Sequence, residues 1–416
     1  MEENKSIEPT EPNVPFPAPA EQTFSKRKKF FLVGSIIIVL IAGLVSWWLL
    51  KDNSSDASKS TTPTTQSSGN AKESKSVESS QLLYTMSGDD ERQTLYWQPI
   101  NGGEKTKATG GFSSKSALTS HAIFNQQVVI ATAEYYGETD PPALWYSKDG
   151  GKSYKQLIAF TKGENNGLGD QITSLVFSSD GKSVVYGLLR ASSNVGEAYE
   201  LNVATGKSEL LFSIQKRGLF IEGYNSTTKQ ALYYEGCFNC DGNSSTELMK
   251  WDGKTNKTQT LLKTDTYTRL AIKSDFTELI ALNGTYDPAS ADFLGGGTKP
   301  PYMVQKVSIA DGTVTPLASV DAEVAGVGYI AGTGDAYYVT ATQIMSATTS
   351  PKELFKTSGK IGQVLSVDSE RIVVSTSASA TDEGYTVQNY SRTNGTSRTI
   401  ASGDAKMNVF GVTGEK

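Results

Sequence analysis

The chain has 416 residues, of which 20% are charged and 37% are hydrophobic, and its formal net charge is −5. This length suits one large domain with additional segments or two smaller domains, and the acidic balance provides no basic footprint for nucleic acid. The chain contains two cysteines and one histidine, which leaves little capacity for histidine-based catalysis or a histidine-rich metal site.

The N-terminal part predicts a single-pass membrane protein. Residues 1–29 are rich in Pro and Glu and indicate a disordered tail. Residues 30–50 carry no charge and as a helix would span about 31 Å, which matches the hydrocarbon core of a bilayer. Four basic residues, 26–29, precede this stretch and Lys51 alone follows it, so the positive-inside rule predicts a cytoplasmic N-terminus. The alternative is a cleaved secretory signal, but no small-residue cleavage site follows.

After this helix the chain is expected outside the cytoplasm, held at the cell membrane. Residues 51–80 are rich in Ser and Thr and predict a flexible extracytoplasmic stalk. Residues 81–416 then change to short β-rich runs separated by Gly, Asp and Asn turns. The runs group in fours, as in "SLVFSSDGKSVVYGLL" followed by "AYELNVATGKSELLF", with a spacing of about 40–55 residues. Such units are typical of β-propeller blades.

The number of units predicts an all-β, seven-bladed propeller, with six or eight blades as alternatives. One further unit is split between the two ends of this region. The chain from residue 82 onward supplies three strands of it, and residues 407–412 supply its first strand. Sharing strands in this way closes the ring and removes open sheet edges. Six complete units begin near His121, Asp170, Gly218, Tyr267, Val324 and Ile361.

The stretch "SKDGGKSYKQL" at 147–157 has the pattern Ser-x-Asp-x-Gly-x-x-aromatic, with Tyr154 where Trp or Phe is usual. It resembles the Asp-box of sialidases and related propellers, and the repeated units are similar to TolB-like propellers. The resemblance implies a structural turn away from any catalytic centre, in which Asp149 accepts backbone N–H bonds and Gly150 or Gly151 takes a positive φ. A sialidase would also need an arginine cluster and a Tyr/Glu nucleophile pair, and arginines are sparse here.

No catalytic residue and no metal site are predicted from motifs. The sequence lacks a Gly-x-Ser-x-Gly elbow, a P-loop, a dinucleotide fingerprint and a His-Glu-x-x-His helix. His121 is expected at a structural or rim position. Cys237 and Cys240 are expected to form a disulfide, with a redox motif or a zinc site as alternatives. We expect no cofactor, with calcium at residues 241–247 as the alternative.

Loop length points to a binding face. The turns after the first and third strands of the units are short, whereas six loops after second strands are long and lie on the opposite face. These loops combine carboxylates with aromatic residues, which suits a basic protein segment, a cation or a sugar ring. The alternative is that they are simply solvated. The predicted ligand-binding residues are Tyr135, Tyr136, Asp241, Tyr286, Asp287, Asp292 and Asp382.

These observations favour an extracytoplasmic propeller that binds a protein or glycan ligand, or acts as a scaffold, through its long-loop face. An alternative is a propeller glycosidase or lyase with two carboxylates about 5–10 Å apart on that face. A third hypothesis is a sensor whose Pro-rich tail recruits a cytoplasmic partner.

Overall fold

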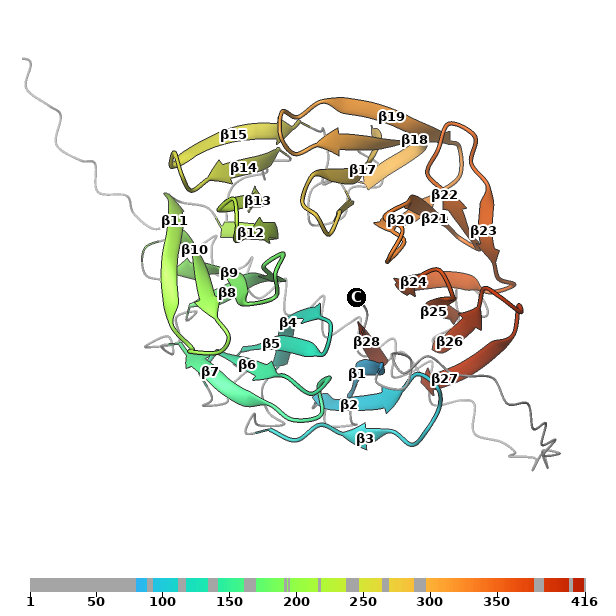
Figure 1. Ribbon diagram of the computed structural model, residues 1–416, viewed down its shortest axis with the longest axis horizontal. Helices are drawn as coiled ribbons and strands as arrows, with labels where there is room; N and C mark the ends of the chain where they lie inside the picture. Colours follow the sequence, from blue (N-terminus) through green and yellow to red (C-terminus); the bar gives the residue numbers. More distant parts are fainter. Residues whose placement is uncertain are drawn as a thin grey trace, which may run out of the picture. The chain divides into compact units, whose positions relative to one another are not determined.

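The computed structural model describes residues 80–87, 93–110, 117–133, 141–160, 170–190, 193, 195–215, 218–236, 247–263, 269–287, 297–377, 385–403 and 407–414. All of them belong to one compact unit, Lys72–Lys416. The described residues form 28 β-strands in seven four-stranded antiparallel sheets, which surround a central axis (Figure 1). The predicted seven-bladed β-propeller is therefore confirmed, and the alternatives of six or eight blades do not apply.

Both ends of the described chain build blade 1. Strand β28 pairs antiparallel with β1, with Leu82 opposite Val412, so the ring closes as the split unit predicts. Strand β1 is thereby paired on both sides, and β28 becomes the innermost strand of the blade. From the axis outward, the strands of blade 1 are β28 (Met407–Thr413), β1 (Gln81–Ser87), β2 (Gln93–Pro99) and β3 (Thr106–Lys107).

Blades 2 to 4 consist of consecutive strands, again given from the axis outward. Blade 2 comprises β4 (Ala117–Phe124), β5 (Gln127–Ala133), β6 (Ala143–Ser147) and β7 (Lys155–Ala159). Blade 3 comprises β8 (Gln171–Phe177), β9 (Ser183–Arg190), β10 (Val195–Asn202) and β11 (Ser208–Gln215). Blade 4 comprises β12 (Gly218–Asn225), β13 (Gln230–Gly236), β14 (Leu248–Asp252) and β15 (Lys257–Leu262).

Blades 5 to 7 follow the same order. Blade 5 comprises β16 (Leu270–Ile272), β17 (Glu278–Asp287), β18 (Gly297–Ser308) and β19 (Val314–Val320). Blade 6 comprises β20 (Val324–Tyr329), β21 (Ala336–Thr340), β22 (Gln343–Ser346) and β23 (Glu353–Lys356). Blade 7 comprises β24 (Lys360–Val367), β25 (Arg371–Ser377), β26 (Tyr385–Ser391) and β27 (Ser397–Gly403). The predicted blade starts thus coincide with the innermost strands or lie just before them.

The hydrophobic core lies between the blades. Seven clusters of buried side chains occupy the seven junctions between successive blades. At the junction of blades 2 and 3, for example, Val129 and Leu144 pack with Val184 and Leu188. Apolar residues therefore appear on both faces of a blade, which is why the second strands read as nearly continuous apolar runs.

The propeller has two faces with different connections, because the antiparallel strands of each blade reverse direction at alternate ends. We call the face with the first-to-second and third-to-fourth connections the short-turn face, and the opposite one the long-loop face. Figure 1 looks onto the short-turn face, which carries the β4–β5 and β10–β11 turns. On the long-loop face, blade 6 has a connection of just two residues, 341–342, between its second and third strands.

The chain enters and leaves the propeller on the short-turn face. The Ile100 N–H donates to the Ser80 carbonyl (3.2 Å), and Ile100 follows the third strand of blade 1. The Gly414 N–H donates to the carbonyl of Asn125 (2.7 Å), which lies in the β4–β5 turn. Ser80 and Gly414 therefore both lie on the side of the propeller opposite the second-to-third connections.

The turn between β6 and β7 forms the hydrogen bonds that the sequence predicts. The N–H groups of Lys152 and Ser153 donate to Asp149 Oδ1 at 3.1 and 3.0 Å. Gly150 and Gly151 have φ values of 76° and 87°, in the left-handed region that glycine tolerates best. Asp149 thus acts as the structural centre of a tight turn.

The same turn also joins two blades. The Thr109 N–H donates to the Lys152 carbonyl (2.9 Å), and the Tyr154 N–H donates to the Thr109 carbonyl (2.8 Å). Thr109 follows the outermost strand of blade 1, so the β6–β7 turn holds blade 2 against it. Tyr154 is buried at this junction beside Leu83.

Candidate functional site on the long-loop face and the central channel

The structure covers few of the predicted site residues. Tyr286 and Asp287 end β17, where their backbones pair with Thr298 and Gly297 of β18. This hairpin places both residues toward the long-loop face, as expected from the sequence. The other predicted positions lie outside the described residues: Tyr135, Tyr136, Asp241, Asp292, Asp382, and the cysteines Cys237 and Cys240.

Two further expectations concern regions outside the described part. The predicted membrane helix at 30–50 is not among the described residues, and among those no helix is long and apolar enough to cross a bilayer. The segment 241–246 is also outside them. In the described ranges, no three His, Cys, Asp or Glu side chains come together as a set that could hold a metal ion.

The best-defined polar group at the long-loop end is centred on Arg190, the last residue of β9. Its Nη1 donates to Asp170 Oδ2 (2.5 Å), just before β8, and its Nε donates to Glu197 Oε2 (2.7 Å) on β10. Its Nη2 donates to the Tyr199 hydroxyl (3.2 Å), which in turn donates to Glu197 (3.0 Å). One arginine therefore ties together three strands of blade 3.

The hydrogen bonds of Arg190 stabilise the long-loop end of blade 3, and they do not favour proton transfer. Burial would lower the pKa of Arg190, but its hydrogen bonds to Glu197, Tyr199 and Asp170 outweigh burial and raise the pKa, so the guanidinium stays charged. The two carboxylates share this cation and are therefore not free to act as an acid–base pair. The Arg190 side chain is still 35% exposed at the long-loop end.

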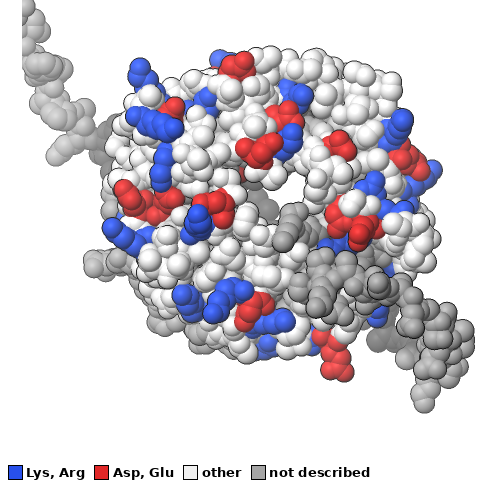
Figure 2. Space-filling view, viewed as in Figure 1, with Lys and Arg blue, Asp and Glu red and all other residues white. Residues whose placement is uncertain are grey.

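A second polar position lies on the innermost strand of blade 4. Strand β12 borders the central axis, where the space-filling view shows a hollow (Figure 2). The β12–β13 register shifts between Ile221 and Gly223, so Glu222 is the extra residue of a β-bulge and has no partner across the ladder. No hydrogen bond or ion pair joins Glu222 to another residue in the described ranges. Burial raises the pKa of its carboxyl to about 7.

Blade 3 holds this bulged strand in place. The Ile221 N–H donates to Ser174 Oγ (2.7 Å), and the Thr173 hydroxyl donates to the Leu219 carbonyl. Gly187 of β9 permits this approach, since a Cβ there would lie 2.3 Å from the Leu219 oxygen. The Ser174 and Thr173 hydroxyls thus form hydrogen bonds with the backbone of β12. The carboxyl of Glu222 forms none with the described residues.

His121 has the structural position that we expected. Its Nε2 lies 2.9 Å from the Phe410 carbonyl oxygen, and its ring stacks on the Phe410 ring at 4.5 Å between centroids. Burial lowers its pKa, which favours the neutral imidazole. His121 therefore joins the innermost strands of blades 2 and 1.

The sequence reading did not select Arg190, Asp170 or Glu222 as functional residues. A signal for Glu222 was present, because it stands alone as a charge between apolar Ile221 and Gly223 in "GLFIEGYN". A charged residue followed by glycine inside an apolar strand indicates a bulge. Nothing comparable marks Asp170, which reaches Arg190 through the folding of the whole blade.

Comparisons with known proteins support the fold. No known protein family and no curated protein matches the sequence. Among solved structures, TolB from Acinetobacter baumannii is similar over 81% of this chain and 66% of its own, with 15% identity and a TM-score of 0.41. An oligogalacturonate lyase in complex with manganese gives 12% identity and a TM-score of 0.48, over 77% of this chain and 84% of its own.

The β-propeller domain of the Trilobed protease from Pyrococcus furiosus has a TM-score of 0.51 with 10% identity, over 77% of this chain and 91% of its own. Identities of this size extend to the fold and no further. Together with the seven sheets and the closure of β28 on β1, this similarity identifies residues 81–414 as a seven-bladed β-propeller.

Proposed function

We propose that the chain is a membrane-anchored, extracytoplasmic binding module that takes a protein or glycan ligand on its long-loop face. The observation that carries the proposal is the position of Ser80 and Gly414 on the short-turn face. With residues 30–50 as the anchor and 51–80 as the stalk, the tether joins one side of the propeller and the long loops occupy the other. A rigid scaffold with long loops directed away from its tether is a suitable geometry for binding.

The chemistry of the long-loop side supports a polar ligand. The hairpin β17–β18 brings the backbones of Tyr286 and Asp287 to this side, and Arg190 presents a partly exposed guanidinium beside two carboxylates. Aromatic and acidic groups together recognise a basic peptide segment or a sugar ring. The similarity to TolB structures extends to the fold, so the ligand is inferred from these residues alone.

A thermal-shift titration of the full chain in detergent micelles tests the proposal. Basic peptides, an oligosaccharide panel and calcium chloride are titrated separately. A ligand that binds the native state raises the melting temperature with its concentration. We expect a shift with one of the first two ligand classes and its loss in the variant Asp287→Ala/Asp292→Ala.

Asp311→Ala is the matched control, because Asp311 lies in the β18–β19 turn on the opposite face of blade 5. Each variant is compared with its own ligand-free melting temperature. A shift that persists in Asp287→Ala/Asp292→Ala and disappears in Asp311→Ala would place the ligand on the short-turn face and contradict the proposal.

A further inference from the structure

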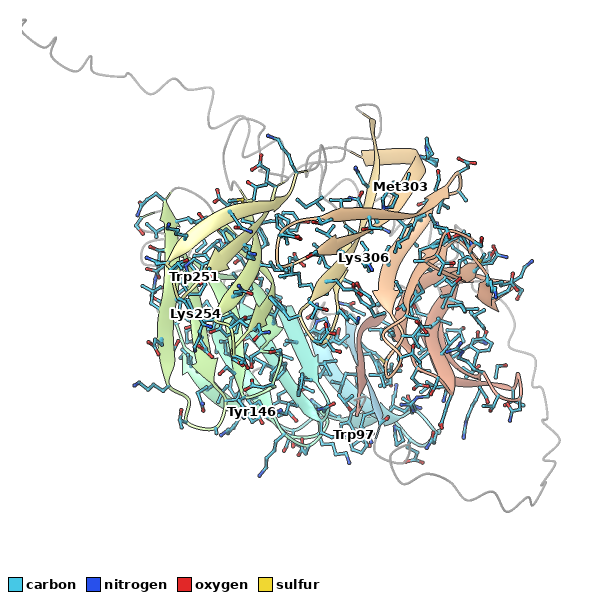
Figure 3. The ribbon with its side chains drawn as sticks, turned by 45° about the horizontal axis from the view of Figure 1, so that its top comes forward. Trp97, Tyr146, Trp251, Lys254, Met303 and Lys306 are labelled. Carbon is cyan, nitrogen blue, oxygen red and sulfur yellow. The ribbon has the colours of Figure 1, made fainter. Side chains whose placement is uncertain are left out.

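Two lysine–aromatic pairs lie at the short-turn end of blades 1 and 2. The Nζ atoms lie 4.9 and 5.7 Å from the ring centroids in the pairs Lys152–Trp97 and Lys155–Tyr146. Figure 3 shows Trp97 and Tyr146 at the same edge of these neighbouring blades. We call this surface the lysine–aromatic patch; it comprises Trp97, Tyr146, Lys148, Lys152 and Lys155.

The rings of the patch rest on a rigid base. Trp97 and Tyr146 are half-buried, and they pack on the core clusters of two successive junctions, between blades 1 and 2 and between blades 2 and 3. Lys152 is fixed by the backbone bond that its carbonyl accepts from Thr109 (2.9 Å). The lysine side chains are exposed above the rings. The patch is therefore preorganised, with apolar surface beneath a layer of positive charge.

Positive charge dominates this part of the short-turn face. The turns at 100–107 and 148–156 contain five lysines, against Glu104 and Asp149 as acidic residues. Asp149 is occupied by its bonds from Lys152 and Ser153 and by the Ser153 hydroxyl. In the space-filling view, basic side chains lie on this part of the face with acidic ones among them (Figure 2). The five lysines and two carboxylates leave a net charge of +3 on these two turns.

The patch lies where the chain joins the propeller. Ser80 begins blade 1 on this same face, and residues 51–80, as a flexible stalk, would span about 30 Å on average. The patch can therefore reach the surface in which residues 30–50 are expected to be anchored. Tyrosine and tryptophan rings favour the headgroup level of a bilayer, and lysines near the surface favour anionic lipids.

We propose that the lysine–aromatic patch docks the propeller onto anionic phospholipid headgroups of the membrane that holds the N-terminal segment. This inference rests on the membrane anchoring in the proposed function. Docking would keep the short-turn face against the bilayer and the long-loop face turned outward. Each lysine near an anionic surface contributes about fivefold to the partition, and the effect decreases with salt.

Lysine footprinting of the full chain in lipid nanodiscs tests the docking. The chain is reconstituted in phosphatidylcholine alone and in phosphatidylcholine with one quarter phosphatidylglycerol, and the acylation rate of each lysine is measured by mass spectrometry. We expect phosphatidylglycerol to slow acylation of Lys148 severalfold at low salt. Lys356 and Lys360, at the β23–β24 connection on the long-loop face, should react equally in both lipids.

Two variants with the same loss of charge separate the patch from general electrostatics. In Lys152→Gln/Lys155→Gln, the protection of Lys148 should fall to that in phosphatidylcholine alone. In Lys356→Gln/Lys360→Gln, it should be unchanged. All four positions are exposed, so both variants should keep the melting temperature of the parent chain.

The outcomes distinguish the docking from the anchoring. A chain that enters nanodiscs but shows equal acylation in both lipids would overturn the docking and leave the anchoring intact. A chain that does not enter nanodiscs would overturn the anchoring. In that case the chain is sedimented with vesicles of the same two lipid compositions. Co-sedimentation with phosphatidylglycerol that Lys152→Gln/Lys155→Gln abolishes would support the patch, and its absence would overturn it. Protection by dextran sulfate but by neither lipid would also overturn the lipid assignment.

Discussion

The short-turn face and the innermost strand of blade 4 use carboxylates in opposite ways. In the β6–β7 turn, burial would raise the pKa of Asp149, but hydrogen bonds from Ser153, Ser147 and backbone N–H groups outweigh it and lower the pKa. Glu222 has no such donor among the described residues, and burial raises its pKa to about 7. A carboxylate with N–H donors within four residues is structural, whereas one in an apolar strand keeps its proton near neutral pH.

The same contrast applies to the positive charges. Lys152 and Lys155 lie over aromatic rings on the short-turn face and remain exposed. Arg190 at the long-loop end is instead held by two carboxylates and a tyrosine. The two lysines are therefore available to a partner, whereas the charge of Arg190 is already paired.

The largest effect is expected for Asp149→Ala, which removes the centre of the β6–β7 turn. Asp149 loses four hydrogen bonds, from the Ser147 hydroxyl, the Lys152 N–H, and the N–H and hydroxyl of Ser153. The junction with Thr109 then loses its support. We expect a loss of about 2–3 kcal/mol in the free energy of unfolding, measured by chemical denaturation at pH 7. Asp311→Ala, which removes a bond to the Thr313 N–H, should cost about 1 kcal/mol or less. Equal losses of unfolding free energy in both variants would show that the contact between the β6–β7 turn and blade 1 does not stabilise the protein.

An effect of opposite sign is expected for Glu222→Gln. Its folded pKa of about 7 lies above the ordinary value of 4.5, so the folded state binds more protons than the unfolded state between these pH values. The contribution of Glu222 to stability is complete below about pH 4.5 and is lost as the pH rises through 7. The rise in pKa corresponds to about 3 kcal/mol at pH 8, which the partial exposure of Glu222 reduces to about 2 kcal/mol. At pH 8 the variant should therefore be more stable than the parent by this amount, and at pH 4.5 the two should be alike.

Denaturation midpoints at pH 4.5, 6 and 8 give the measurement. Glu200→Gln is a suitable control, because Glu200 accepts hydrogen bonds from Tyr224 and Lys229 (both 2.9 Å). Its removal should destabilise the protein at pH 8. A Glu222→Gln variant that is less stable than the parent at pH 8 would mean that the carboxylate has a partner in the folded protein.

The smallest effect is expected for the coupling between Arg190 and Glu197. The pair is 2.7 Å apart but partly exposed, so screening by water weakens it. A double-mutant cycle of Arg190→Met and Glu197→Gln should give a coupling free energy of about 1 kcal/mol that decreases with salt. A coupling that does not change between about 0.05 and 0.5 M salt, a range that runs from weak to strong screening, would contradict this exposed location.

The sequence alone determined the blades, because each blade is built from local units. The apolar run, the tight Gly or Asp turn and the next run are neighbours along the chain, so the starts near Gly218 and Val324 could be read directly. Ring closure by β28 and β1 was predictable too, since one blade would otherwise lack a strand. The Asp149 turn was predictable for the same reason, as all its partners lie within four residues.

The tertiary structure alone decided which charged groups are paired. Arg190 meets Asp170, 20 residues earlier, because three strands of blade 3 end together. Trp97 and Lys152 meet because the ring brings blades 1 and 2 into contact. The state of Glu222 likewise depends on burial by neighbouring strands and on a bulge that Ser174 of another blade holds in place. Hydrogen bonds within a turn follow from local sequence, whereas burial and pairing between blades depend on contacts that no short segment contains.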